Sequence, residues 1–161
     1  MPKHQKTNVM RILDRAGIAY QAHQYEHQTG DPVDGVSVAA RTGEPEDQVF
    51  KTLVTVGASG QNYVFVIPVA AQLDLKKAAK SVGEKWVEMI PVSGIQALTG
   101  YVRGGCSPIG MKKQFPTVLD NTAKQHATIL VSGGRIGSQI ELAPQQLKDL
   151  IQAKFEAIIQ S

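Results

Sequence analysis

The sequence predicts an α+β domain built on a curved, mixed β-sheet, and two observations predict it. Stretches with strand-like and helix-like periodicity are interspersed along the chain without a regular βαβ repeat. Two apolar stretches, 49–56 and 63–67, flank the short connection Gly57-Ala58-Ser59-Gly60, a pattern typical of a β-hairpin. Because a hairpin pairs its strands antiparallel, the pattern disfavours an all-parallel, doubly wound sheet.

Composition and charge limit the class of protein. The chain has 161 residues, and we expect residues 1–161 to form a single domain. Hydrophobic residues make up 42% of it and charged residues 19%, which allows a core and excludes a disordered chain. No stretch has the apolar run of a signal peptide or a membrane-spanning helix. A single cysteine excludes an internal disulfide framework, so we expect a soluble cytoplasmic protein with no membrane partner.

Spacing and capping residues predict the N-terminal elements. Apolar residues recur at helical spacing over 9–16, Thr7 or Asn8 can cap the first turn, and Gly17 can end the helix. The elements expected next are a strand over 18–25, a loop over 30–35, a short helix over 36–42 that stops at Gly43, and a helical turn over 45–48. The hairpin strands follow.

More helices and short strands follow the hairpin. Asp74 can cap a helix over 75–82, with Gly83 beyond its end. Pro144 suits the first position of a closing helix, whose apolar stripe is expected to reach Phe155. The elements expected between these two helices are a strand over 87–90, a helix over 95–98 ending at Gly100, and strands over 118–119, 128–131 and 139–142.

The most informative motif is a glycine-rich turn, Gly104-Gly105-Cys106-Ser107-Pro108-Ile109-Gly110. Consecutive glycines expose backbone N–H groups, so a substrate oxygen can approach them closely and accept hydrogen bonds. Upstream, Lys51 lies inside an apolar strand pattern, where few water molecules can share its charge. Together the two features predict a site for an anionic group, or for a group that becomes anionic during a reaction.

Each candidate also has a structural explanation. Lys51 could instead be an edge-strand lysine that discourages aggregation, and the residues alone leave both interpretations open. Ser132-Gly133-Gly134 lacks the spacing and the lysine of a P-loop, so a hairpin turn explains it more simply than a phosphate cradle. His23 and His27 flank a strand pattern and no carboxylate completes a cluster with them, so we predict neither a metal nor a cofactor.

Cys106 is a candidate nucleophile within the turn. A catalytic cysteine needs a base within reach and a lowered pKa. No histidine has a sequence context that ties it to this turn. We therefore interpret Cys106 as a small residue that fills the turn.

A mildly basic balance leaves room for a polyanionic partner. The net charge is +3 and the isoelectric point is near 9.0. The basic residues of the middle and later chain are Lys76, Lys77, Lys80, Lys85, Arg103, Lys112, Lys113, Lys124 and Arg135. Such charges usually form a solvated face, but a cluster of them around the glycine turn would bind a phosphate backbone.

Five segments carry more information together than any one of them alone. They are Tyr25-Glu26-His27, Phe50-Lys51-Thr52-Leu53, the stretch 73–80, the stretch 100–110, and Ser132-Gly133-Gly134. In this order and at these lengths they resemble the YbaK-type aminoacyl-tRNA deacylases, which are relatives of the editing domain inserted in bacterial prolyl-tRNA synthetases. The resemblance covers nearly the whole chain, and the Phe-Lys-Thr-Leu strand and the Gly-Gly-x-Ser-Pro-x-Gly turn are its specific parts.

The resemblance implies both a fold and an activity. The implied fold is a mixed, largely antiparallel, barrel-like sheet surrounded by helices. The implied activity is removal of the amino acid from a mischarged tRNA, with Cys-tRNA(Pro) as the expected substrate. In the family mechanism the thiol of the substrate cysteine attacks its own ester carbonyl and releases the tRNA. The expected partners are the tRNA acceptor end and prolyl-tRNA synthetase, since a small domain offers little surface for the tRNA body.

The resemblance also assigns roles to residues. Lys51 matches the essential lysine of the family, and with the N–H groups of Gly104 and Gly105 it is the expected catalytic set. The expected substrate-binding residues are Tyr25, Phe50, Thr52, Ser107, Pro108, Ser132, Gly133, Gly134 and Glu141. Gln139 stands where some relatives carry a carboxylate, and it removes that charge.

Other functions remain open at this point. The same fold could remove another small amino acid, such as alanine, by activating a water molecule. A non-catalytic tRNA-binding or synthetase-associated module would keep the basic surface but would not need Lys51 together with an intact glycine turn. A small-molecule binder could use the lysine to hold a carboxylate.

Overall fold

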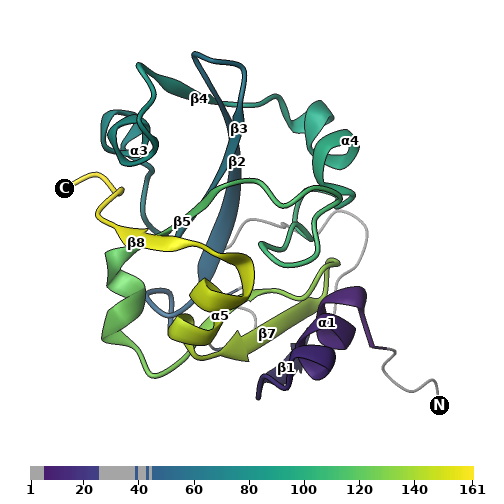
Figure 1. Ribbon diagram of the computed structural model, residues 1–161. Helices are drawn as coiled ribbons and strands as arrows, with labels where there is room; N and C mark the ends of the chain where they lie inside the picture. The colour runs from purple at the N-terminus through teal and green to yellow at the C-terminus, as the bar shows by residue number, and fades with distance from the viewer. Residues whose placement is uncertain (1–5, 26–38, 40–42, 44) are drawn as a thin grey trace.

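Two β-sheets form the centre of the structure (Figure 1). The computed structural model describes residues 6–25, 39, 43 and 45–161. The larger sheet has the strand order β4 (Val87–Met89), β2 (Phe50–Gly57), β3 (Asn62–Pro68), β5 (Thr117–Asp120) and β8 (Lys154–Glu156). The smaller sheet has the strand order β1 (Gln21–Gln24), β7 (Ser138–Leu142) and β6 (Ile129–Ser132).

Strand pairing confirms a mixed, largely antiparallel arrangement. The predicted hairpin forms, with β2 antiparallel to β3, and every pairing in the smaller sheet is antiparallel. β5 is parallel to both β3 and β8, so the far side of the larger sheet is parallel. An isolated parallel bridge between Val49 and Leu130 links the sheets. The larger sheet stays open, with β4 and β8 at its edges, so its strand order does not close a barrel.

Four α-helices surround the sheets in the described part of the chain. They are α1 (Asn8–Ala16), α3 (Leu75–Val82), α4 (Ile95–Thr99) and α5 (Pro144–Ile151), with the 3-10 helices η1 (Val92–Gly94) and η2 (Asn121–Gln125) between them. Thr7 caps α1 and Asp74 caps α3, each accepting hydrogen bonds from first-turn N–H groups as predicted. None of the helices in these residues has the length and apolar character that crossing a membrane requires.

The C-terminal prediction was wrong in one respect. The closing helix ends at Ile151, because Gln152 adopts a left-handed conformation with φ 54°. Phe155 therefore lies in β8, where it pairs with Leu119 of β5. A three-residue strand with no alternating pattern of its own forms here because a neighbouring strand offers backbone partners.

Two N-terminal predictions also differ or go untested. The strand expected over 18–25 is shortened to β1, which pairs only where β7 lies opposite it. The loop expected over 30–35 and most of the helix expected over 36–42 lie outside the described residues.

Both faces of the central strands β3 and β5 are buried, which explains their continuous apolar sequences. Along β3, Val64 and Val66 point to a core shared with α1, α5 and the smaller sheet. Phe65 and Ile67 point to a second core, which includes residues of α3 and Ile158. In Figure 1, α3 and α1 accordingly lie on opposite sides of β2 and β3.

A buried carboxylate holds the C-terminal segment against the sheet. Asp120, at the end of β5, is 1% exposed. Its Oδ2 accepts hydrogen bonds from the N–H and the hydroxyl of Thr122, and its Oδ1 accepts one from Ile158 N at 3.0 Å. The side chain thus caps η2 and fixes the last residues beside α3.

We expect Asp120→Ala to lower the free energy of unfolding by about 2–3 kcal/mol, because it leaves the buried N–H of Ile158 without a partner. Urea denaturation followed by circular dichroism measures this loss. Thr122→Ala removes one of the three bonds and should cost about 1 kcal/mol. An Asp120→Ala midpoint equal to that of the parent would show that the carboxylate contributes nothing.

Candidate functional site

A cavity of about 560 Å³ lies beside the first half of β2. β4 pairs with β2 only over Thr55–Gly57, so the preceding residues, 51–54, can line the cavity. Its polar lining residues are Tyr25, Lys51, Thr52, Gln72, Arg103, Cys106, Ser132, Ser138 and Gln139. Apolar residues of β2 and of the segment after β4 complete the wall.

Lys51 is held by an internal strand. β2 lies between β4 and β3, and Lys51 stands opposite Ile67 in the hairpin. At Lys51 itself, β4 does not pair with β2, and the cavity lies beside this half of the strand. Lys51 and the exposed Arg103 are two cationic side chains on one cavity, which suits an anionic ligand.

Three residues that line the cavity each carry a buried side-chain oxygen that has no hydrogen-bond partner among the described residues. The three atoms are Thr52 Oγ1, Ser138 Oγ and Gln139 Oε1. No other buried side-chain oxygen or nitrogen in the described residues shares this property. Because each such atom costs about 1–3 kcal/mol, their concentration in residues around one cavity marks a region that packing for stability alone does not explain.

The glycine turn contributes one glycine to the cavity lining. Gly104 lines the cavity and has φ 87°, a conformation that favours glycine. Gly105 does not line it, and its N–H donates to Val102 O at 3.0 Å. A Cβ on Gly105 would lie 2.8 Å from Arg135 Cα and 3.0 Å from Ile136 N. Gly105 is therefore where the turn packs against the backbone of the β6–β7 connection.

The rest of the turn is fixed internally. Ser107 and Pro108 are buried behind the cavity wall, and Ser107 Oγ accepts a hydrogen bond from Ile109 N at 3.2 Å. The hydroxyl of Tyr101 donates to Ile109 O at 2.5 Å. These bonds hold the backbone of the turn in one conformation.

Cys106 lines the cavity, but its environment disfavours the thiolate. Burial raises the pKa of this thiol to about 11. At neutral pH the group is therefore protonated and a poor nucleophile. This agrees with the interpretation of Cys106 as a residue that fills the turn.

The β6–β7 hairpin contributes Ser132, Ser138 and Gln139 to the cavity lining. Tyr25, Phe50 and Ser132 line the cavity as expected, whereas Gly133 and Gly134 lie outside its lining. Gly133 N donates to Ser138 O at 2.8 Å, and a Cβ on Gly133 would lie 2.2 Å from Ser138 Oγ. The glycine thus makes room for the buried Ser138 hydroxyl.

Glu141 lies on the same strand as Gln139 but outside the cavity lining. Its Oε1 is 2.7 Å from His23 Nε2, and its Oε2 accepts a hydrogen bond from the Thr128 hydroxyl at 2.6 Å. The Thr128 hydroxyl, and then His23, hold the pKa of the Glu141 carboxyl below its usual value of 4.5. The carboxylate, on β7, therefore links His23 of β1 to Thr128, which stands just before β6.

Sequence reasoning did not single out Arg103 or Ser138 as site residues. Arg103 was visible only as one basic residue among many, and no local pattern marked Ser138. Residues two apart share one face of a strand, so strand periodicity does not tell whether Gln139 or Glu141 reaches the cavity. No group of three or more His, Cys, Asp or Glu side chains able to hold a metal occurs among the described residues.

Gly105→Ala should lower the free energy of unfolding by about 1–3 kcal/mol, because the added methyl group meets backbone atoms that have little freedom to move. Chemical denaturation measures this change. Gly94→Ala is the matched control, since a Cβ there would lie 3.9 Å from its nearest neighbour. Equal stabilities of the two variants would contradict the packing role of Gly105.

Glu141→Gln should destabilise the protein at pH 7 by about 1 kcal/mol. Because the pKa of Glu141 is lowered on folding, its contribution is complete above about pH 4.5 and is lost as pH falls through the folded-state pKa. The unfolding curves of the parent and the variant should therefore converge below pH 4.5. A difference that is independent of pH would exclude this titration as its source.

Known proteins with similar sequences and folds point to the same family as the motifs of this chain. The model of the aminoacyl-tRNA editing domain family matches residues 32–150. A protein of Enterococcus faecalis named "Putative Cys-tRNA(Pro)/Cys-tRNA(Cys) deacylase EbsC" is 47% identical over 154 residues, which cover 96% of this chain and 93% of the relative.

Two solved structures share the fold at lower identity. One is titled as a "putative trans-editing enzyme for prolyl tRNA synthetase" (TM-score 0.81, 23% identity, 98% and 100% of the two chains covered). The other is a hypothetical protein, APE2540 (TM-score 0.85, 22% identity, 94% and 99% covered). The chain therefore belongs to the aminoacyl-tRNA editing domain family, as its motifs indicated.

Proposed function

We propose that this protein is a trans-editing deacylase that removes cysteine from mischarged Cys-tRNA(Pro). The observation that carries the proposal is one cavity lined by Lys51, Gly104 and three residues with unsatisfied buried polar atoms, in a chain of the editing family. The name of the 47% identical relative supports the choice of substrate.

The chemistry asks little of the protein. An aminoacyl ester is already activated, so the enzyme needs to position it and to stabilise negative charge on its carbonyl oxygen. In our proposal the N–H of Gly104 donates to that oxygen, a contribution of about 3 kcal/mol for a well-aimed donor. Lys51, helped by Arg103, holds a phosphate or the ribose of the terminal adenosine and so fixes the position of the ester.

The nucleophile comes from the substrate in this proposal. The cysteine thiol of the substrate loses its proton, and its sulfur forms a bond to its own ester carbonyl carbon. The ester C–O bond then breaks, the ribose oxygen takes up a proton, and a small cyclic thioester leaves. A thiol with a pKa of about 8.5 supplies a usable fraction of thiolate at neutral pH, whereas a serine hydroxyl does not. The high pKa of Cys106 fits this assignment, since the protein thiol stays protonated.

The unsatisfied polar atoms supply the remaining contacts in this proposal. Gln139 Oε1 is an acceptor and suits the α-ammonium group of the amino acid. The hydroxyls of Thr52 and Ser138 both donate and accept, and they suit the ribose hydroxyls or the ester. Because Gln139 carries no charge, it has no acid–base role.

The other expected site residues act by positioning in this proposal. Gly105, Ser107 and Pro108 hold the turn, and Gly133 and Gly134 shape the hairpin that carries Ser132 and Ser138. Tyr25 and Phe50 form part of the wall. Glu141 fixes β7, and with it Gln139, through His23 and Thr128.

We further propose that the protein acts in the cytoplasm and that prolyl-tRNA synthetase supplies the choice of tRNA. The cavity can accommodate only the end of the tRNA, so contacts to the tRNA body need additional surface. On this proposal the isolated protein discriminates poorly among tRNAs that carry cysteine, and added synthetase restores the preference.

The experiment measures release of labelled amino acid from Cys-tRNA(Pro) and Ala-tRNA(Pro), side by side, with purified protein. We expect rapid loss of cysteine and little loss of alanine, because alanine has no side-chain nucleophile. Lys51→Ala should lower kcat/KM for Cys-tRNA(Pro) by at least 100-fold, whereas Cys106→Ala should keep most of the activity.

Each alternative result has a distinct meaning. Loss of alanine instead of cysteine would replace the thiol-assisted step with attack by water in the same cavity. Equal activity of the Lys51→Ala and Cys106→Ala variants would contradict the assignment of Lys51. If neither ester is cleaved, the protein is a binding module and the proposed function is wrong.

A further inference from the structure

A track of exposed apolar side chains leads away from the cavity along β4. Five large hydrophobic residues are exposed in the described part of the chain. Four of them belong to this one region: Leu75, Trp86, Met89 and Val92. Met89 and Val92 line the cavity, and Trp86 stands just before β4, at its other end and on the other face of the extended chain from Met89. Such a concentration of exposed apolar side chains is typical of a surface that binds a partner molecule or a ligand.

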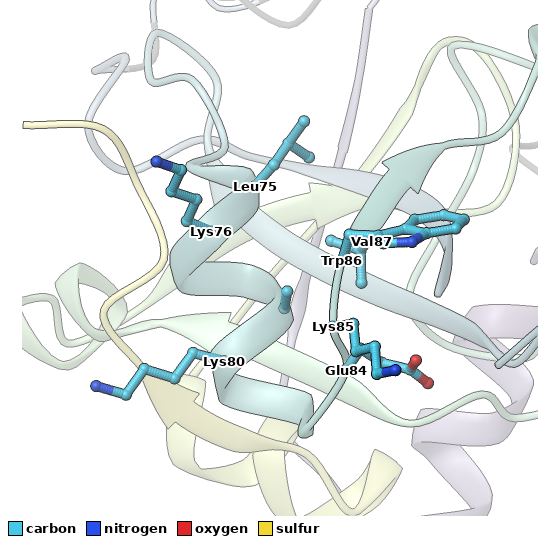
Figure 2. Close-up of a pocket in the computed structure, with 8 residues that line it drawn as sticks. Leu75, Lys76, Lys80, Glu84, Lys85, Trp86 and Val87 are labelled. Carbon is cyan, nitrogen blue, oxygen red and sulfur yellow. The ribbon is translucent and has the colours of Figure 1, made fainter. Parts of the chain in front are cut away.

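The track ends in a groove between α3 and β4, which is shown in Figure 2. The groove has a volume of about 360 Å³. Leu75 and Ala79 form its α3 side, and Trp86 and Val87 form its β4 side. Trp86 is 49% exposed, and in Figure 2 its indole projects beside β4, away from the helix.

The charge around this groove is positive. Lys76, Lys80 and Lys85 border it, and in Figure 2 the two lysines of α3 extend from the side of the helix that faces away from Trp86. The carboxylate of Glu84 is already bound by the Ser59 hydroxyl at 2.5 Å and the Tyr63 hydroxyl at 2.6 Å. Glu88, exposed on β4, is the other acidic residue on this stretch, so the lysines outnumber the acids.

We propose that the α3–β4 groove and the track along β4 bind the single-stranded 3′ end of the tRNA and the phosphates that precede it. This inference rests on the proposed function, because it assumes that the terminal nucleotide occupies the cavity. An unpaired base stacks on Trp86, and phosphates lie against Lys76, Lys80 and Lys85.

Geometry and chemistry favour RNA over a protein partner. From Trp86 to the cavity residue Ile90 is four residues of extended chain, or about 13 Å, a span of only a few nucleotides. A single strand that runs from Trp86 across the groove to the lysines of α3 can use both features, because an exposed aromatic side chain stacks a base and lysines neutralise phosphates. An apolar protein helix would leave these lysines without partners.

The first test uses intrinsic fluorescence, since Trp86 is the only tryptophan in the chain. Titration with uncharged tRNA(Pro) should quench its emission, and a tRNA(Pro) that lacks the single-stranded 3′ nucleotides should quench it much less. No amino acid is present, so the result does not depend on catalysis. Absence of quenching, or equal quenching by both RNAs, would overturn the stacking role of Trp86.

The second test compares two substrates of different length. Trp86→Ala should lower kcat/KM on Cys-tRNA(Pro) by about tenfold, the size of one base–aromatic stack, and Trp86→Phe should restore most of it. Neither variant should change the rate on the cysteinyl ester of adenosine, which is too short to reach the groove. Equal losses on both substrates would show that Trp86 only supports the cavity and would overturn the proposal.

Salt dependence tests the lysines. Lys76→Ala/Lys80→Ala should make the slope of log kcat/KM against log salt less steep by about 1.4–1.8 on the tRNA substrate. Lys148→Ala, on α5 and outside the groove, is the matched control and should leave the slope unchanged. An unchanged slope in the double variant would overturn the phosphate contacts.

Failure of this inference and failure of the proposed function give different results. If the parent protein cleaves neither ester, the proposed function is wrong, and the fluorescence titration still decides whether the groove binds RNA. If the groove variants lose activity only when prolyl-tRNA synthetase is added, the groove binds the synthetase and the RNA proposal is wrong.

Discussion

The unequal pairing of β2 with its two neighbours determines where chemistry can occur. β3 accompanies β2 along nearly its whole length, whereas β4 pairs only with the last residues of β2. The first half of the strand is thus held rigidly on one side and faces a cavity on the other. A charged lysine can stand in a strand that is otherwise apolar because this half of the strand is not sealed on both sides. A longer β4 would cover the same backbone and leave no room for a substrate.

Backbone packing couples the two loops that build the rest of the cavity. Gly105 approaches the backbone of Arg135 and Ile136 so closely that no side chain fits between them. The glycine turn and the β6–β7 hairpin are therefore one unit, and Gly104 and Ser132 keep a fixed relation to each other. Such rigidity matters for a reaction whose barrier is lowered mainly by positioning and by preorganised N–H donors.

The residues around the cavity include a cysteine of low reactivity and several polar groups without partners. Cys106 is protonated at neutral pH, and three residues of the lining carry buried polar atoms that have no hydrogen-bond partner in the described part of the chain. This is the opposite of a site that relies on its own nucleophile, which would need a base and a lowered pKa. A substrate that brings its own thiol fits such a site, and its chemistry then adds to the selectivity that a small pocket alone supplies only modestly.

The sequence by itself determined the local structure. Caps such as Thr7 and Asp74, stop glycines and the hairpin connection specify elements through contacts within a few residues, and these elements formed as predicted. The motifs around Lys51 and the glycine turn were also legible, because they are contiguous segments with a specific order, and they identified the family. Only the tertiary structure decided what depends on distant partners. β8 forms because β5 offers it backbone partners, so Phe155 lies in a strand and not in the predicted helix. Gln139 rather than Glu141 reaches the cavity, and Gly104 rather than Gly105 lines it, because the packing of β1, β7 and the 135–136 backbone selects between neighbours that look alike in the chain.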